Sequence, residues 1–351
     1  MKTSSRFYVS ALIVFAIGCS IATTRSPADP RFARGAVVNA DDPGCETLAL
    51  VSTGGAFPKD PKTLAIRWTG YTNFELVYNG QIILLDAHFD RGSMFPPLGF
   101  NAADVKRANV ILLGHGHLDH MSDAASVGAR TGALVVGAPV TTEKLLTQKI
   151  DPKQVRTVTG RGGELLEFPG FTVEPILGRH GEPPKNVTAA FDGALKSTAP
   201  QPTPEQVAER NEIRQRDTND SRVITEGTIA YLITLDNGFR IMYRDSGGAV
   251  TDYEKAAMQR IGRVDVALVA VSAAFLHTLT AQRALEHMRA YKPDVYIPSH
   301  HDAPFNGLWR ATEPLFQALK DENLNIITVS RGYREPICFD TENNIQRRQG
   351  R

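Results

Sequence analysis

The sequence predicts an α+β protein in which two β-sheets pack face to face and helices cover their outer sides. Short apolar runs typical of buried strands alternate with helical segments, and this succession occurs twice, once on each side of a polar stretch at 186–222. The 351-residue chain, with 42% hydrophobic residues, is long enough to bury a sizeable core. We therefore expect one large domain at 64–336 with an insert at 186–222, preceded by an extension at 23–63 and followed by a tail at 337–351.

Apolar periodicity places the elements of the first half. Strands are expected at 64–70, 73–80, 81–89, 109–114 and 132–139, and a hairpin at 163–178. Asn79-Gly80 is typical of a tight hairpin turn. Helices are expected at 121–131 and at 139–150, the second capped by a threonine near its start.

The polar insert separates this half from a second one. It is rich in Pro, Thr, Gln and charge and contains one expected exposed helix at 203–216. The insert either caps a site or is a solvated excursion. After it, strands are expected at 227–238, 239–248, 264–272 and 294–300, with a helix at 280–291.

The N-terminus has the layout of a secretory signal over residues 1–22. Lys2 and Arg6 precede an apolar stretch from Phe7 to Gly18, which is short for a transmembrane helix. "AIGC" resembles a lipoprotein box, in which Cys19 would be lipidated and would attach the protein to a membrane. "SIA" before Thr23 instead fits an ordinary signal-peptidase site. Both alternatives predict export, to the periplasm or as a membrane-anchored lipoprotein.

The cysteines and the net charge indicate the redox compartment and the class of partner. Once Cys19 is lipidated or removed, Cys45 and Cys338 remain, and in an oxidising compartment we expect a disulfide between extension and tail. The alternative is two thiols too far apart to meet. A formal net charge of +1 without a long basic run disfavours nucleic acid as a partner and leaves a small-molecule or lipid substrate open. The oligomeric state is left open.

The stretch "GHGHLDH", Gly114 to His120, directly follows an expected strand. In extended backbone His115, His117 and Asp119 alternate, so they point to one side, and His120 follows where the chain turns into a helix. Imidazole and carboxylate are ligands that zinc prefers. This spacing lets His115 and His117 hold one ion while Asp119 and His120 reach a second.

"HGHLDH" resembles the signature of the metallo-β-lactamase superfamily. The resemblance extends from about Leu64 to Ala303, because the remaining family motifs follow in order: Asp86 in "IILLDAHF", His180 in "ILGRHG", Asp245 in "IMYRDSG" and His300 in "VYIPSHHD". It implies an αββα sandwich with the metals at one edge of the paired sheets.

The resemblance also implies a role for each motif residue. One zinc ion would be held by His115, His117 and His180, and a second by Asp119, His120 and His300, with Asp245 bridging. Asp86 would orient the metal histidines, and Asp119 would also orient the nucleophile, a hydroxide generated at neutral pH from a water shared by the two Zn²⁺ ions. Imidazole and carboxylate also accept manganese and iron.

The flanking sequence is similar to the lactonase-like and N-acyl-phosphatidylethanolamine phospholipase D-like branch. Arg244, Tyr71 and His277 depart from the usual pattern, which leaves the substrate open. For further histidines alternatives remain: His88 and His277 either contact substrate or merely pack, and His301 either lines the cleft as a substrate contact or faces solvent. His287, in a helical run, is expected at the surface.

We therefore expect an exported metal-dependent hydrolase that cleaves an ester, lactone or phosphodiester bond. The alternatives are a β-lactamase and a non-catalytic metal-binding surface or periplasmic protein of the same fold. A di-iron redox protein is disfavoured, since such relatives have a glutamate in place of His117 and carry a flavin domain.

Overall fold

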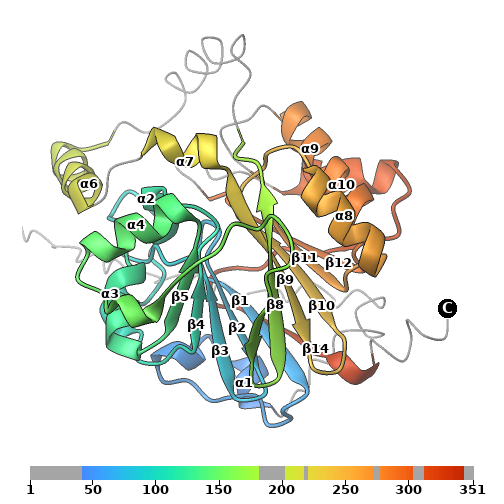
Figure 1. The fold of residues 1–351 in the computed structure, drawn as a ribbon, viewed down its shortest axis with the longest axis horizontal. Helices are drawn as coiled ribbons and strands as arrows, with labels where there is room; N and C mark the ends of the chain where they lie inside the picture. The colour runs from blue at the N-terminus through green and yellow to red at the C-terminus, as the bar shows by residue number, and fades with distance from the viewer. Residues whose placement is uncertain (1–41, 182–201, 217–219, 272–276, 303–311, 344–351) are drawn as a thin grey trace, which may run out of the picture.

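The computed structural model describes residues 42–181, 202–216, 220–271, 277–302 and 312–343. These residues form two seven-stranded sheets that pack face to face, with helices on both outer sides (Figure 1). The expected αββα sandwich is confirmed. The signal segment, Cys19 and most of the polar insert lie outside the described residues.

The first sheet, sheet A, is built mainly from the N-terminal half. Its order is β14-β1-β2-β3-β4-β5-β6, antiparallel from β14 to β3 and parallel from β3 to β6. Asn79 and Gly80 both have positive φ, as a tight turn between β2 and β3 requires. The strands are β1 (Thr63–Trp68), β2 (Phe74–Tyr78), β3 (Gln81–Leu85), β4 (Val110–Leu112), β5 (Leu134–Gly137), β6 (Val155–Thr157) and β14 (Pro336–Asp340).

The second sheet, sheet B, has the order β13-β12-β11-β10-β9-β8-β7. It is antiparallel from β7 to β10 and parallel from β10 to β13. The strands are β7 (Leu166–Phe168), β8 (Phe171–Gly178), β9 (Thr228–Leu235), β10 (Arg240–Arg244), β11 (Val266–Ala270), β12 (Val295–Ser299) and β13 (Ile327–Thr328).

The core lies between the two sheets and continues under the helices. Alternate residues of each strand, such as Ile66, Leu76, Tyr231 and Ile241, meet in the space between the sheets. The intervening residues of the same strands pack against the outer helices. Because both faces are covered, the strands are nearly continuous apolar runs.

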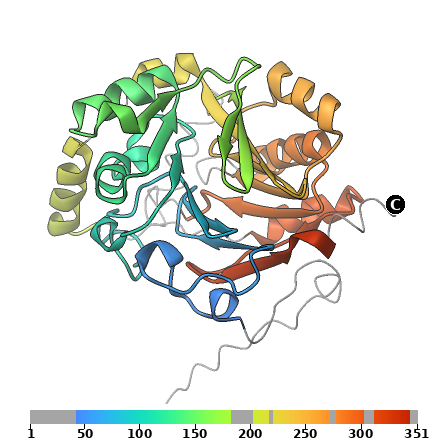
Figure 2. The same ribbon diagram turned by 60° about the horizontal axis from the view of Figure 1, so that its bottom comes forward.

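Two groups of helices cover the sandwich, one against each sheet (Figures 1 and 2). Sheet A carries α2 (Leu118–Met121), α3 (Ala124–Thr131) and α4 (Pro139–Thr147), and sheet B carries α8 (Asp252–Ile261), α9 (His277–Tyr291) and α10 (Glu313–Asp321). The insert contains α6 (Pro204–Arg216), and α7 (Ser221–Glu226) begins at its C-terminal end. Short helical turns complete the list: α1 (Pro43–Glu46), η2 (Val51–Thr53), η3 (Ala102–Asp104) and η4 (Pro152–Gln154).

The expected threonine cap of α4 is wrong. Its N-cap is Ala138 without a side-chain hydrogen bond, and Pro139 occupies the first turn, where a missing N–H costs nothing. Thr141 and Thr142 lie inside the helix and are buried. Within the described part of the chain, no helix is both long and apolar enough to cross a membrane.

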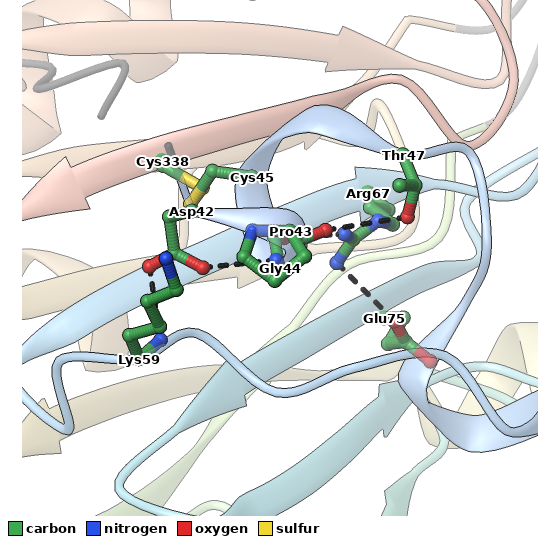
Figure 3. The surroundings of a disulfide bond; sticks show 9 residues. All are labelled: Asp42, Pro43, Gly44, Cys45, Thr47, Lys59, Arg67, Glu75 and Cys338. Atoms are coloured by element: carbon green, nitrogen blue, oxygen red, sulfur yellow. Dashed lines mark hydrogen bonds and ion pairs between the residues drawn. A yellow bond between two sulfur atoms is a disulfide. The ribbon is translucent and has the colours of Figure 1, made fainter. Parts of the chain in front are cut away.

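The segment 42–58, which we call the N-terminal cover, packs on the outer face of sheet A. Cys45 forms a disulfide with Cys338 of β14 (Figure 3), as the cysteine count predicts. β14 lies within the expected C-terminal tail, but it pairs with β1 and buries Phe339 in the core, so the sheet extends to Asp340. Beside the disulfide, the buried Arg67 reaches the Gly44 carbonyl and lies 3.6 Å from Glu75.

Candidate metal centre

Strand ends from both sheets meet at one edge of the sandwich. Asp245 and His300 directly follow β10 and β12, and His180 lies two residues beyond β8. On the sheet A side, His115 follows β4, and α2 carries Asp119 and His120. The fold thereby brings together all seven residues that the sequence assigns to metal binding, although their motifs are up to 185 residues apart, from His115 to His300.

Three overlapping groups of side chains have ligand atoms within 4.8 Å of one another. His115 and His120 each belong to two of the groups, which makes the whole set continuous. The groups are His115, His117 and His180; His115, His120 and Asp245; and Asp119, His120 and His300. This partition matches the division into two ions with Asp245 between them that the resemblance implies.

Unpaired buried polar atoms indicate that these side chains fit a metal. Among the described residues, Asp245 Oδ1, His180 Nδ1 and His300 Nδ1 are buried without a hydrogen-bond partner. The ring nitrogens His115 Nε2 and His117 Nδ1 lie 3.0 Å apart. A buried polar atom without a partner is costly, whereas imidazole nitrogen and carboxylate oxygen bind zinc and related ions directly.

Asp86 holds one of these histidines in a fixed orientation. Its carboxylate lies 2.7 Å from His120 Nδ1 and accepts hydrogen bonds from the Gly114 N–H, at 2.9 Å, and from the Thr72 hydroxyl, at 2.5 Å. A carboxylate on one ring nitrogen leaves the other, Nε2, available to a metal ion. Asp86 itself has φ +55 at the end of β3. Sequence reasoning missed Thr72, for which the only signal is a polar residue between two apolar strands.

Gly114 allows the closest approach within the centre. A Cβ atom at this position would lie 2.0 Å from both Cγ and Oδ2 of Asp245. Any side chain would therefore displace the carboxylate that contacts His115 Nδ1. The first glycine of "GHGH" is required by packing between the two sheets, which the sequence alone does not show.

The electrostatics of the site separate the histidines into two kinds. Burial, followed by repulsion from neighbouring histidines, lowers the pKa of His115 and His180 and lowers that of His117 to about 4. Burial also acts to lower the pKa of His120, but Asp119, Asp86 and Asp245 outweigh it and raise that pKa to about 10. His115, His117 and His180 are thus neutral at pH 7, with lone pairs available, whereas His120 lies in a field that stabilises a cation.

The carboxylates also differ. Burial raises the pKa of Asp245 well above its ordinary value, although His120 opposes it. Burial would raise the pKa of Asp119 too, but His120 and His300 outweigh burial and lower it. Asp119, with a quarter of its side chain exposed, is therefore an ionised acceptor at the open side of the centre.

Tyr71 and Asp302 fix the position of His300 through a chain of hydrogen bonds. Sequence reasoning missed these contacts. The His300 N–H donates to the Tyr71 carbonyl at 2.7 Å, and the Tyr71 N–H donates to the buried Asp302 carboxylate at 2.9 Å. Arg91 and the Tyr333 hydroxyl donate to the same carboxylate at 2.7 and 2.5 Å. The Tyr71 ring meets that of His300 edge-on, with centroids 5.1 Å apart.

The remaining histidines differ in position. His88 is buried beside Tyr71 and within 2.7 Å of the Ser122 hydroxyl. His301 is buried in a stack with Trp68, at 4.4 Å between centroids, so packing accounts for it. His277 begins α9, but its side chain lies outside the described residues.

The expectation that His287 lies on the surface is wrong. Its side chain is fully buried next to Tyr291, because α9 packs against β11 on one side and against α8 and α10 on others.

Comparison with known proteins agrees with this geometry. Residues 65–300 match the model of the beta-lactamase superfamily domain. The chain belongs to the metallo-β-lactamase superfamily and has its fold.

Individual relatives are distant. A UPF0173 metal-dependent hydrolase of Polynucleobacter asymbioticus is 23% identical over 76% of this chain and 83% of its own. Among solved structures, the metallo hydrolase Igni18 of Ignicoccus hospitalis has a TM-score of 0.55 at 15% identity, covering 79% of this chain and 98% of that one. An isothiocyanate hydrolase from Delia radicum gut bacteria has a TM-score of 0.50 at 13% identity, covering 78% and 97%. At such identities the structures show the shared fold alone.

Proposed function

We propose that the protein is a metal-dependent hydrolase that cleaves an ester, lactone or phosphodiester bond. The observation that carries the proposal is the convergence of seven side chains that could hold metal ions, among them the buried Asp245 with its unpaired Oδ1. Its distant relatives include proteins named as metal-dependent hydrolases, which supports the same reaction class. The choice of bond rests on the flanking sequence that resembles the lactonase-like branch.

The residues of the centre have different roles in the proposed reaction. His115, His117 and His180 would hold one ion, Asp119, His120 and His300 a second, and Asp245 would lie between them. Two bound divalent ions would lower the pKa of a shared water and polarise the oxygen of the bond being broken. Asp119, ionised and partly exposed, accepts a hydrogen bond from the attacking water and orients it. Asp86 and Thr72 keep His120 in one ring orientation throughout.

A cavity of about 470 Å³, lined by polar and apolar residues and by none of the seven candidate ligands, has room for a small organic substrate. Among its lining residues are Phe89, Phe95, Leu98 and Phe100, so it offers an apolar wall. Phe95 lies 5.4 Å from Tyr71 between ring centroids, and Tyr71 contacts His300. The aromatic contacts therefore lead from this cavity to the metal centre.

We also propose that the protein is exported, either as a soluble periplasmic protein or as a lipoprotein anchored through Cys19. The signal-like residues 1–22 and the disulfide between Cys45 and Cys338 support this, since such bonds persist in oxidising compartments. Mass spectrometry of the protein made in its native host distinguishes the two forms: a mature chain starting near Thr23, or one starting at an acylated Cys19. A full-length cytosolic chain would contradict export.

The experiment that tests the proposed reaction combines metal analysis with a substrate panel. Purified protein is loaded with zinc, manganese or iron, its metal content is measured, and chromogenic phosphodiesters, lactones, esters and β-lactams are assayed. Asp119→Ala should abolish the hydrolysis, whereas Asp252→Ala, which removes a fully solvated aspartate paired with Lys255, should leave it unchanged. A protein that takes up no stoichiometric metal, or an Asp119→Ala variant with full activity, would contradict the proposal.

A further inference from the structure

Arg244 is a fully buried arginine that directly precedes Asp245 at the end of β10. The metallo-β-lactamase superfamily, whose motifs this sequence resembles, usually has glycine at this position. Its guanidinium donates from Nε to the Ser246 carbonyl at 2.8 Å and from Nη2 to the Arg179 carbonyl at 2.7 Å. Nη2 also lies 3.4 Å from the Ala249 carbonyl.

These carbonyls belong to two loops that each carry a metal ligand. Arg179 directly precedes His180, whereas Ser246 and Ala249 belong to the loop that begins with Asp245. The Arg244 side chain therefore joins the two loops through hydrogen bonds to their backbone oxygens alone.

Two further features show how closely the loops lie. The Gly181 N–H donates to the Ser246 hydroxyl at 2.8 Å. A Cβ atom on Gly248 would lie 2.0 Å from the Arg179 carbonyl oxygen. The loops thus touch along their backbones, and Arg244 sits where both sets of carbonyls converge.

The charge of this guanidinium is balanced away from the metal centre. Nη1 pairs with the buried Glu254 of α8, and the same carboxylate accepts a hydrogen bond from the Tyr291 hydroxyl of α9. A buried cation without such a partner would be strongly destabilising. Glu254, supported by Tyr291, engages Nη1 of the Arg244 guanidinium. The other two nitrogens, Nε and Nη2, therefore point at the loops. Arginine suits this task because its rigid, planar group donates in several fixed directions.

We propose that Arg244 is a positioning residue that sets His180 and Asp245 at the spacing needed by the ion shared with His115 and His117. This inference rests on the proposed function, because it assumes that the centre binds metal. Partners that orient metal ligands typically account for about 10- to 100-fold in affinity. The expected consequence is mainly selective: the ion held by Asp119, His120 and His300 depends on Arg244 only through the Asp245 carboxylate, so it should be weakened less.

The test compares Arg244→Lys with Tyr291→Phe in the full-length mature protein. Zinc affinity is measured by competition with a chromophoric chelator, which yields two stepwise dissociation constants. Lysine keeps a positive charge beside Glu254, but its single ammonium cannot reach both loops. We expect one constant to weaken by about 10- to 100-fold and the other, which depends on Arg244 only through Asp245, to weaken clearly less.

The control and a second variant separate positioning from stability. Tyr291→Phe weakens the Glu254 network but keeps every carbonyl contact of Arg244, so both constants should equal those of the wild type. If Arg244→Lys does not fold, Arg244→Met/Glu254→Gln removes both charges together, which buried ion pairs often tolerate. It should show the same selective loss.

The outcomes distinguish this inference from the proposed function. If the wild type binds none of zinc, manganese and iron, the metal centre itself is disproved. If the wild type binds two ions and a folded Arg244 variant binds both with unchanged affinity, the positioning role is overturned and the proposed function stands. Equal weakening by Tyr291→Phe would also overturn it, because a general loss of packing would then be the cause.

Discussion

The metal centre and the N-terminal cover both bury charged side chains, but the partners of these side chains differ between the two regions. Under the cover, Arg67 lies 3.6 Å from Glu75 and donates to the Gly44 carbonyl, and Glu75 accepts the Val51 and Ser52 N–H groups at 3.0 and 2.7 Å. At the metal centre, Asp245 Oδ1 has no such partner among the described residues. Under the cover the counter-charge comes from the chain itself, although Arg67 Nε and Nη1 have no hydrogen-bond partner in the described part of the chain, whereas at the centre we propose that bound cations supply it. Buried charge therefore stabilises the fold in one region and specifies a ligand in the other.

The largest effect should follow from Asp245→Ala. Removing the carboxylate common to both ions should weaken zinc binding by more than about 100-fold, since even orienting partners account for up to that factor. The metal-free variant should be at least as stable as the wild type, because it loses a buried carboxylate whose Oδ1 has no hydrogen-bond partner in the described structure, together with the Oδ2 hydrogen bond to His115. Zinc competition and thermal unfolding measure the two.

The matched control is Asp265→Ala, which removes another buried aspartate, one that accepts the Arg240 N–H at 2.7 Å. It should lower stability and leave zinc affinity intact. A metal-free Asp245→Ala protein that is much less stable than the wild type would mean that Asp245 is structural, as the buried charges of the cover are.

Glu75→Ala should destabilise the N-terminal cover and leave the metal centre unchanged. Arg67 would remain buried without its counter-charge, and the Val51 and Ser52 N–H groups would lose their acceptor. Breaking one side of a buried pair costs about 3–5 kcal/mol in unfolding free energy. Denaturant titration measures this loss. Unchanged zinc affinity in the folded variant is also expected, and a parallel loss of zinc would couple the two regions.

Removing the disulfide should have a somewhat smaller effect. The bond joins residues 293 positions apart, and losing such a bond typically costs about 2–5 kcal/mol. Cys45→Ala/Cys338→Ala should therefore unfold at lower denaturant concentration, with hydrolysis of the best panel substrate unchanged in the folded protein. Equal stability of the variant and the wild type would show that β14 and the cover hold without the bond.

The pH dependence should give the smallest and most specific signal. Because the folded pKa of His120 is raised to about 10, its proton stabilises the metal-free protein fully below about pH 6.5, and this contribution is lost as pH rises through about 10. Zinc binding at pH 7 should accordingly release at least about one proton, measurable by calorimetry in buffers of different ionisation enthalpy. Proton release that is equal at pH 7 and above pH 10 would contradict this role of His120.

Much of both regions could be predicted from local pattern. Apolar runs located the principal strands, and the order of "HGHLDH", His180, Asp245 and His300 identified the seven side chains that the fold brings together. The cysteine count identified Cys45 and Cys338 as partners. Each of these signals is either local in the chain or limited to a few residues of a rare type.

Other features could not be predicted, because their partners are distant and chemically ordinary. β14 looks like a tail until it pairs with β1, and His287 looks exposed until β11, α8 and α10 surround α9. Thr72 acquires its role only where β1 and β2 meet Asp86 and His120.

By itself, the sequence determined the layered fold, the chemical type of the centre and the two cysteines, because periodicity and donor type are properties of the residues. Only the tertiary structure decided which carboxylate stays unpaired, why residue 114 must be glycine and what Arg244 contacts. Those properties depend on approaches of a few ångströms between two sheets, and such distances are set by packing of the whole core.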